Sequence, residues 1–496
     1  MIIKKKKIMR LLKLTLIATL VFGLNTSCFE DQDDNAISAS EINDFVWKAM
    51  NAVYLYKAEV PDLANDRFTS NEEYGNYLNS FSAPEDLFES VIHDREVVDR
   101  FSIIVDDYIA LEQQLSGVFR SNGLEFNFYL APGSETDVVA VIRLVLNDSE
   151  ASDLGLQRGQ IIDKVDGVGI TTSNFQNLFS QISYTLHFAT YDDNGTPDDT
   201  SDDSVNSTSE TASLTKVPYT ENPVYMTKII EVNGQNVGYL MYNSFNADFN
   251  AELNNAFATF QANNVQHLIL DLRYNGGGSV NTATLLGSMI TGQFNGQVFA
   301  KLNYNDDLQE LNTNYNFTNT LGNGGAAINS LNLEAVYVLT TSNSASASEM
   351  VINSLKAYLN DDVVVVGDFT TGKSQASTII YDSPDLGPQN KNPNHTYALL
   401  PLIAITVNKD DGQVPANGLT PDIQIIERGR SLGTLGEVDE PLLAAALANI
   451  QGLGRMAQAN IDEKEKPLNS KVDKKISDEV MFVDVETTSL NRLQIQ

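Results

Sequence analysis

The stretch VYVLTTSNSASASEM, residues 336–350, decides the expected fold. Five residues typical of a buried strand run into small polar residues, and a helical sequence follows over 346–359. A strand that turns into a helix presents a side chain at the sheet edge, where the helix N-terminus offers free N–H groups. This position favours a developing alkoxide, so Ser346 is a candidate nucleophile. The pair Ser346 and Glu349 is also a capping box, which is a purely structural role.

The segments on either side repeat this alternation of strands and helices. Buried strands are predicted at 237–242, 267–272 and 363–366. Helices are predicted between them, at 250–261 and 280–290. The alternation predicts an α/β layered core with partly parallel strands.

A lysine follows a glycine shortly after the 363–366 strand, in TTGKSQ at 370–375. Such a lysine is usually a surface charge. If Lys373 is buried, desolvation lowers its pKa and lets it act as the general base that a serine nucleophile requires. Serine–lysine pairs are a known variant of the catalytic triad. The four histidines lie in no HExxH motif, and no GxSxG motif occurs.

Three glycines follow the 267–272 strand, in DLRYNGGG at 271–278. Bare backbone N–H groups at such a turn form an anion-binding nest. The nest suits an oxyanion hole or a phosphate cradle, although the spacing matches neither GxGxxG nor GxxxxGK[ST]. A tight turn that merely needs glycine is the structural alternative.

The N-terminal half changes character twice. Residues 41–115 have apolar positions at helical spacing and predict a small helical domain, with a last helical stretch at 97–115. Residues 116–225 alternate as strands do, for example at 125–130 and 138–146. The polar run 192–210 predicts a solvated loop whose carboxylates do not have the spacing of a calcium loop.

Residues 1–27 combine basic residues with an apolar run at 14–24 that is too short to span a bilayer, which predicts an export signal. Cys28 is the only cysteine, so no internal disulfide is possible. A small residue before a lone cysteine resembles a bacterial lipoprotein processing site, which implies a lipid anchor at Cys28 and an acidic tether over 28–40. An ordinary signal peptide with an incidental cysteine is the alternative.

Four segments, in order, resemble the C-terminal-processing (tail-specific) serine peptidases. Residues 237–245 resemble the first core strand of that family, and 271–278 resemble its Asp-Leu-Arg-x-Asn-x-Gly-Gly segment. SASASE at 344–349 with Gly372-Lys373 downstream resembles its nucleophile and base segments. GLTPDI at 418–423 resembles its late Gly-x-x-Pro-Asp motif.

The resemblance implies roles for particular residues. Ser346 would be the nucleophile and Lys373 the base. Ser377 stands where members often carry a glutamine, so Gln375 is the candidate third residue. The oxyanion hole would be formed by the backbone N–H groups of three residues: Gly277, Gly278 and Ala347. The implied reaction needs no cofactor and no metal.

Residues 116–225 resemble a PDZ domain. Gly123-Leu124-Glu125-Phe126 resembles the Gly-Leu-Gly-Phe loop, and DLGLQRGQII at 153–162 resembles a bacterial PDZ stretch. Such a domain captures an extended peptide as an added strand and holds a C-terminal carboxylate in a backbone nest. Leu124, Glu125 and Phe126 would therefore bind peptide, with Leu124 and Phe126 lining the pocket. A PDZ-like fold without a ligand is the alternative.

The expected architecture is multi-domain α+β. A helical N-terminal domain (41–115) and a PDZ-like β-rich domain (116–225) precede an α/β layered, ClpP/crotonase-like protease core (226–450). A charged C-terminal tail (451–496) is expected to be peripheral.

The resemblance implies a serine endopeptidase that cleaves envelope or secreted proteins and recognises extended or C-terminal segments. Its partners would be protein or peptide substrates and, through the lipid anchor at Cys28, a membrane. A net charge of −33 disfavours binding to nucleic acid. The expected place is the envelope of a Gram-negative bacterium, on the outer membrane, facing the periplasm or the outside. The alternatives are a catalytically weak or inactive peptide- or ligand-binding lipoprotein of the same fold, and a scaffold lipoprotein.

Overall fold

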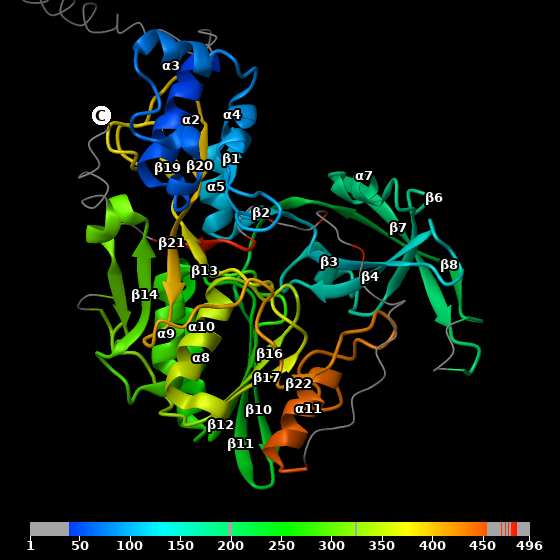
Figure 1. Cartoon of the computed structure of the whole chain (residues 1–496). Helices are drawn as coiled ribbons and strands as arrows, with labels where there is room; N and C mark the ends of the chain where they lie inside the picture. The colour runs from blue at the N-terminus through cyan, green and yellow to red at the C-terminus, as the bar shows by residue number, and fades with distance from the viewer. Residues whose placement is uncertain are drawn as a thin grey trace, which may run out of the picture.

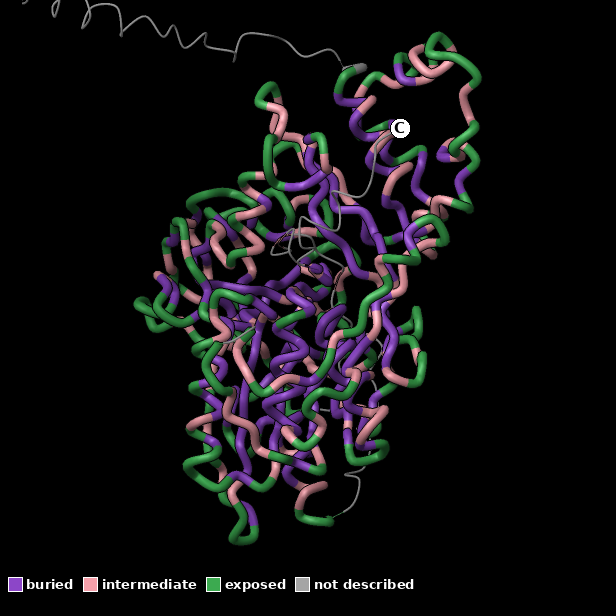
Figure 2. Tube along the Cα trace, turned by 90° about the vertical axis from the view of Figure 1, so that its left-hand side faces the viewer, coloured by how far each residue is buried: buried purple, intermediate pink, exposed green. Residues whose placement is uncertain are grey.

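The computed structural model describes residues 39–196, 201–322 and 325–453, together with residues 468, 472, 475 and 478–483. N-terminal helices lie at the top of the molecule, a β-rich domain at its right, and an α/β core below both (Figure 1). Buried chain is concentrated in the interior of the core (Figure 2). The export signal, Cys28 and most of the predicted tether lie outside the described residues.

A mixed six-stranded sheet forms the centre of the core. Its strands, in spatial order, are β10 (Val224–Val232), β11 (Gln235–Tyr242), β12 (His267–Asp271), β16 (Val336–Thr340), β17 (Val363–Gly367) and β22 (Ile423–Gln424). Only the β10–β11 pair is antiparallel. Successive residues of these strands are buried on opposite faces: Leu270 lies in one hydrophobic cluster and Ile269 in the other. Near-continuous apolar runs are what a sheet covered on both faces requires.

Helices cover both faces of this sheet. Helices α8 (Asn250–Ala262), α9 (Val280–Thr291) and α10 (Ala347–Leu359) contribute to the larger hydrophobic cluster, and α11 (Pro441–Ile450) packs on the opposite face. The predicted layered core is therefore observed, with element bounds shifted by a few residues. Since β12 and β16 are parallel neighbours, the segments that follow them start at the same sheet edge.

A second sheet borders that edge, and it contains a strand from the C-terminal region. Its order is β13 (Gly278–Ser279), β23 (Met481–Phe482), β18 (Gln375–Ser377), β21 (Leu402–Val407), β14 (Val298–Tyr304) and β15 (Thr313–Asn316). The prediction of a peripheral tail is wrong for residues 478–483, because Val480-Met481-Phe482-Val483 is an apolar run that is mostly buried as a strand. β23 is drawn in red near the middle of the molecule (Figure 1).

The N-terminal region is mainly helical, as expected. It contains α2 (Ala39–Val53), α3 (Asn71–Leu78), α4 (Pro84–Ser90) and α5 (Tyr108–Leu115). The predicted helix at 97–115 forms only from Tyr108, where Asp107 caps it, because β1 (Ile103–Val105) pairs instead with β20 (Ala398–Leu400). β20 also pairs with β19 (Ile380–Tyr381). The apolar face of α2 joins the larger hydrophobic cluster of the core, so this region has no separate core.

The β-rich region forms a domain of its own, which we call the β-domain (residues 121–215). Its sheet order is β3 (Leu124–Leu130), β4 (Val138–Val145), β5 (Ile161–Val165), β7 (Ser183–Asp192) and β8 (Ser204–Thr215), with β6 (Val168–Gly169) on β5. Helices α6 (Glu150–Asp153) and α7 (Phe175–Ser180) complete it. The predicted solvated loop at 192–210 is shorter, because the polar residues from Ser204 on pair with β7. Strand β3 is an edge strand.

Short elements connect these parts. β2 (Val118–Ser121) pairs with β9 (Val217–Thr220) where the chain enters and leaves the β-domain. The 3-10 helices are η2 (Lys57–Glu59), η3 (Pro61–Leu63), η4 (Ala247–Phe249), η5 (Asp306–Leu311) and η6 (Asn360–Asp362). Among the described residues, no helix is both long and apolar enough to cross a membrane.

Candidate active site

Two loops meet at the carboxyl edge of the central sheet. The glycine loop (residues 272–278) follows β12, and the serine loop (residues 341–346) follows β16 and leads into α10. Both loops begin at the same edge because their strands pair in parallel, with Asp271 opposite Leu339. Segments about 70 residues apart in the sequence are thereby brought side by side.

Hydrogen bonds from side-chain hydroxyl groups connect the glycine loop and the serine loop. Ser344 Oγ donates to Leu272 O at 2.8 Å, and Ser348 Oγ donates to Asn275 O at 2.9 Å. Thr341 Oγ1 also donates to the backbone carbonyl of Arg273. Two of the three serines in SASAS are therefore structural, because their hydroxyls satisfy buried carbonyl groups.

Ser346 differs from Ser344 and Ser348 in its hydroxyl group and in its backbone. Its side chain is fully buried, yet Oγ has no hydrogen-bond partner within the described residues. Its φ of 63° lies in a region that non-glycine residues rarely adopt and that is enriched at functional sites. A Cβ on Gly277 would lie 2.8 Å from Ser346 Cβ, and Gly277 has a φ of 118°, so this position needs glycine. The serine predicted as nucleophile is thus the one with an uncommitted hydroxyl.

Lys373 is also fully buried, which the sequence alone left open. Burial lowers the pKa of its amine to about 7, although the carboxylates of Glu479, Asp99 and Glu349 act in the opposite direction. Its Nζ lies 4.8 Å from the centroid of the Phe101 ring and donates to Glu479 O. A lysine with a pKa near neutrality can exist as the free amine that accepts a proton.

Glu349 connects the two candidate residues. Its carboxylate accepts hydrogen bonds from the backbone N–H groups of Ser346 (2.8 Å), Gly372 (2.7 Å) and Lys373 (2.8 Å), and from Thr370 Oγ1. Burial raises the pKa of this carboxyl, while the four hydrogen bonds act to lower it. Sequence reasoning assigned Glu349 only a capping role. Its link to Lys373 depends on a contact between distant segments, for which the sequence carries no local signal.

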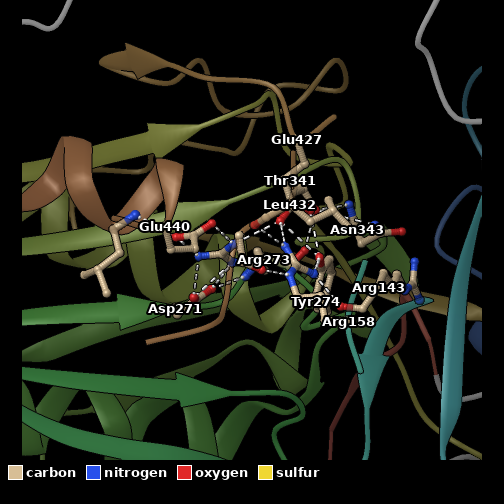
Figure 3. A network of polar contacts seen from close by, with 12 residues as sticks. Arg143, Arg158, Asp271, Arg273, Tyr274, Thr341, Asn343, Glu427, Leu432 and Glu440 are labelled. Carbon is tan, nitrogen blue, oxygen red and sulfur yellow. Dashed lines mark hydrogen bonds and ion pairs between the residues drawn. The ribbon is translucent and has the colours of Figure 1, made fainter. Parts of the chain in front are cut away.

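A buried ionic network lies at the start of the glycine loop (Figure 3). Arg273 is fully buried and contacts Asp271 (2.8 Å), Glu440 (2.6 Å) and Glu427 (2.9 Å). Arg158 of the β-domain contacts the same Glu427 at 2.6 Å. Burial alone would raise the pKa of Glu427, but the two arginines lower it to about 2. The network fixes the end of β12 and attaches the β-domain to it.

The candidate oxyanion donors have different partners. Gly278 N–H donates to Val480 O at 2.7 Å, whereas Gly277 N–H donates to the side chain of Asn275 at 2.9 Å. Ala347 is buried as the first residue of α10. The structure therefore brings the three residues close to Ser346. The N–H group of Gly278 is the one that donates to a backbone carbonyl, that of Val480.

Gln375 is not paired with Lys373 in this structure. Its Nε2 donates to the Tyr56 hydroxyl at 3.0 Å, and its Oε1 is buried without a hydrogen-bond partner. Gln375 begins β18, two residues after the lysine. Its orienting role stays a prediction.

The three residues predicted to bind peptide lie on β3. Leu124 and Phe126 are buried in the hydrophobic core of the β-domain. The N–H group of Leu124 donates to Asn122 Oδ1 at 3.2 Å. Glu125 forms ion pairs with Arg143 at 3.2 Å and with Lys475 at 3.7 Å. Leu124 and Phe126 therefore pack in the core of the β-domain, and Glu125 contacts the C-terminal segment.

Among the described residues, no cluster of His, Cys, Asp and Glu could hold a metal ion.

Comparison with known proteins agrees with this geometry. The model of peptidase family S41 matches residues 236–425, and that of the peptidase S41 N-terminal domain matches residues 41–103. These ranges contain both loops, Lys373, the helices α3 and α4, and most of α2. The chain belongs to peptidase family S41.

Two curated relatives of the chain are C-terminal processing peptidases. The chain is 25% identical over 339 residues to the chloroplastic C-terminal processing peptidase of Tetradesmus obliquus, covering 64% of this chain and 62% of that one. It is 25% identical over 288 residues to the carboxyl-terminal-processing protease of a Picosynechococcus species, covering 56% and 60%. The chain thus spans less than two thirds of the length of these curated relatives.

A crystal structure also matches the fold. The crystal structure of a putative S41 protease from Bacteroides fragilis is 28% identical, with a TM-score of 0.65, and the match covers 82% of this chain and 97% of that one. The mixed α/β architecture with its N-terminal helical region is therefore that of an S41 protein.

Proposed function

We propose that this chain is a serine endopeptidase with a Ser346–Lys373 dyad that cleaves protein substrates. The observation that carries the proposal is the contrast within one motif: Ser344 and Ser348 commit their hydroxyls to buried carbonyls, while Ser346 keeps a buried, unpartnered hydroxyl on a strained backbone. Membership of family S41 supports the same reaction class.

The chemistry follows from the groups around Ser346. The neutral amine of Lys373 accepts the Oγ proton as Oγ attacks a peptide carbonyl carbon, and the lysinium then donates that proton to the leaving amine. The N–H group of Gly278 stabilises the oxyanion, together with those of Gly277 and Ala347 once they face it. Water, deprotonated by the same amine, then hydrolyses the acyl-enzyme and restores Ser346.

The β-domain would deliver the substrate as a PDZ-like module. Support comes from β3, which is the edge strand of its sheet and follows the loop that resembles Gly-Leu-Gly-Phe. An extended peptide can add to such an edge through main-chain hydrogen bonds. Arg158 and Glu427 link this domain to the glycine loop, so a peptide on β3 would lie near the site.

Cellular placement follows from the N-terminal sequence. We propose that the chain is exported, lipidated at Cys28 and held at the outer membrane of a Gram-negative bacterium, with envelope or secreted proteins as substrates. Mass spectrometry of the protein from membranes tests this proposal. A mature chain that starts at Cys28 with added acyl mass is expected, and a mature chain with an unmodified Cys28 would contradict it.

A non-catalytic peptide-binding protein is the second candidate. It is favoured by one observation: Ser346 Oγ has no hydrogen-bond partner, so it is not bonded to Lys373, whose amine donates to Glu479 O instead. In this reading the site would hold a peptide without cutting it.

Cleavage of an unfolded reporter protein distinguishes the two candidates. A soluble chain starting at residue 36 is compared with Ser346→Ala, Lys373→Ala and the matched control Ser342→Ala, whose side chain is exposed in the same loop. We expect the two active-site variants to lose cleavage and acylation by a fluorophosphonate, and the control to retain both. If chains ending at residue 496 and at residue 453 both fail to cleave and to be acylated, the peptidase proposal is wrong.

A further inference from the structure

Residues 478–483, from the C-terminal region, pair with strands beside the candidate active site. β23 is inserted between β13 and β18, and it runs parallel to both. Val483 N–H donates to Ser377 O at 3.0 Å, and Thr378 Oγ1 donates to Val483 O at 3.1 Å. Without this segment, the facing edges of β13 and β18 would lose their only shared partner among the described strands.

The same segment contacts the groups that the proposed reaction uses. Val480 O accepts from Gly278 N–H at 2.7 Å, and Glu479 O accepts from Lys373 Nζ. A Cβ on Gly277 would lie 2.8 Å from Val480 O and 3.0 Å from Ser346 Oγ, so this carbonyl and the hydroxyl lie on the same side of the glycine. A peptide substrate has to place its carbonyl in this position.

Residues upstream in the same segment reach the β-domain. Leu468 N–H donates to Phe128 O on β3 at 2.7 Å, and Leu468 and Val472 pack against the β-domain core. Lys475, later in the same segment, meets Glu125, which precedes Phe128 on β3. Both contacts are made at β3, the edge strand to which an extended peptide can add.

Lys475 anchors the segment between the two regions. It forms an ion pair with Glu221 at 2.6 Å and with Glu125 at 3.7 Å, and its Nζ lies 4.1 Å from the centroid of the Phe119 ring. Beyond it, Val480, Met481 and Val483 are at most 4% exposed. The segment is therefore held by a paired cation, by buried apolar side chains and by main-chain hydrogen bonds, as a peptide ligand is held in its binding site.

We propose that the C-terminal segment, through Leu468, Val472, Lys475 and residues 478–483, is an internal peptide ligand, which contacts β3 and the candidate catalytic groups and must leave before a protein substrate enters. The inference rests on the proposed function and deepens it. It also defines the ligand class: an extended peptide with a basic residue that meets Glu125 and Glu221, followed about five residues later by apolar residues. While the segment is bound, Gly278 N–H and Lys373 Nζ are both occupied.

Binding in trans tests the proposal without relying on catalysis. A fluorescent peptide of residues 466–485 is titrated into a chain that ends at residue 453 and carries Ser346→Ala. We expect saturable binding in fluorescence anisotropy. The matched control is the same peptide with K475E and M481D. These changes reverse the charge facing Glu221 and place a carboxylate where the buried Met481 side chain lies. The control peptide should bind at least tenfold more weakly.

Activity provides the second readout. The chain ending at residue 453, otherwise native, should cleave an unfolded reporter at least tenfold faster than the full chain, and the native peptide should restore inhibition. If the shortened chain does not fold, the full-length variant Met481→Asp is used instead. It should likewise cleave faster than the native chain, and added native peptide should slow it.

The outcomes separate this proposal from the proposed function. Binding of the native peptide without turnover by any chain would contradict the peptidase but retain the internal ligand. Turnover at equal rates in the full, shortened and Met481→Asp chains, with no preference for the native peptide, would overturn the internal ligand and retain the peptidase.

Discussion

The backbone N–H groups of Ser346 and Lys373 donate to the same atom, Glu349 Oε2, each at 2.8 Å. The serine lies at the N-terminus of α10 and the lysine lies in the turn before β18, so no local hydrogen bond sets their separation. One carboxylate on the first turn of α10 therefore fixes the backbones of both. Glu349 is a positioning residue by this geometry.

Replacing Glu349 with Gln is the first prediction. A glutamine presents one acceptor oxygen in place of two, and a hydrogen bond to a charged group contributes about 1.5–3 kcal/mol. We expect kcat on a peptide reporter to fall about 10- to 100-fold with little change in KM, because the substrate contacts remain. The control Glu334→Gln, exposed before β16, should keep its kcat. An unchanged kcat in Glu349→Gln would show that the carboxylate does not position the dyad.

The three alternating serines give the second prediction. Ser346→Ala should abolish acylation by a fluorophosphonate with at most a small loss of thermal stability, since Oγ donates to no acceptor and has only the capping-box contact with the backbone of Glu349. Ser344→Ala and Ser348→Ala should each lower the free energy of unfolding by about 1–3 kcal/mol, because a buried carbonyl loses its donor. Both should still be acylated at Ser346. Acylation at Ser344 or Ser348 in the native protein would reassign the nucleophile.

Structural features that depend on a local sequence pattern were predictable from the sequence. The buried strands β11, β12, β16 and β17 are recognisable as apolar runs, and the strand–turn–helix at Ser346 marked the site. The shared carboxylate of Glu349 and the burial of Lys373 were not predictable, because both arise from contacts between segments more than 20 residues apart.

The C-terminal strand illustrates the same limit more strongly. Residues 480–483 are four apolar residues in a charged stretch, which is too short a pattern to indicate a strand. Their partners, β13 and β18, are two or three residues long and lie more than 100 positions away. A charge-based prediction of a peripheral tail was therefore reasonable, and wrong for residues 478–483.

The pH dependence of cleavage is the third prediction. Burial lowers the pKa of Lys373 to about 7, and only the neutral amine can accept the Oγ proton. We expect kcat/KM to rise with pH, with a midpoint near 7, and to level above it. The profile is measured on a neutral peptide reporter so that the substrate does not titrate. A midpoint near 10 would mean that Lys373 has the pKa of an ordinary lysine and is not buried in the active protein.

The fourth prediction concerns Arg273. Arg273→Met leaves Asp271, Glu440 and Glu427 without their shared cation in a buried site, and breaking a buried pair in this way costs about 3–5 kcal/mol. We expect a loss of that size in urea unfolding. Arg67→Met is the control, since its ion pairs with Asp62 and Glu73 are partly exposed and such pairs contribute at most about 1 kcal/mol. Equal losses in the two variants would show that the Arg273 network is not desolvated.

The stability of Lys373→Met is the last prediction, and its sign follows from linkage. The folded chain binds a proton at Lys373 only below about pH 7, whereas the unfolded chain binds one below about 10.5. The proton therefore favours the unfolded state, by an amount that grows as the pH falls from 10.5 to 7 and is constant below. A methionine carries no such proton, so Lys373→Met should raise the melting temperature, more at pH 6 than at pH 9. The comparison is made on a Ser346→Ala background to prevent self-digestion. A lower melting temperature at both pH values would mean that the contact with Glu479 O and the nearby carboxylates stabilise the lysine more than burial destabilises it.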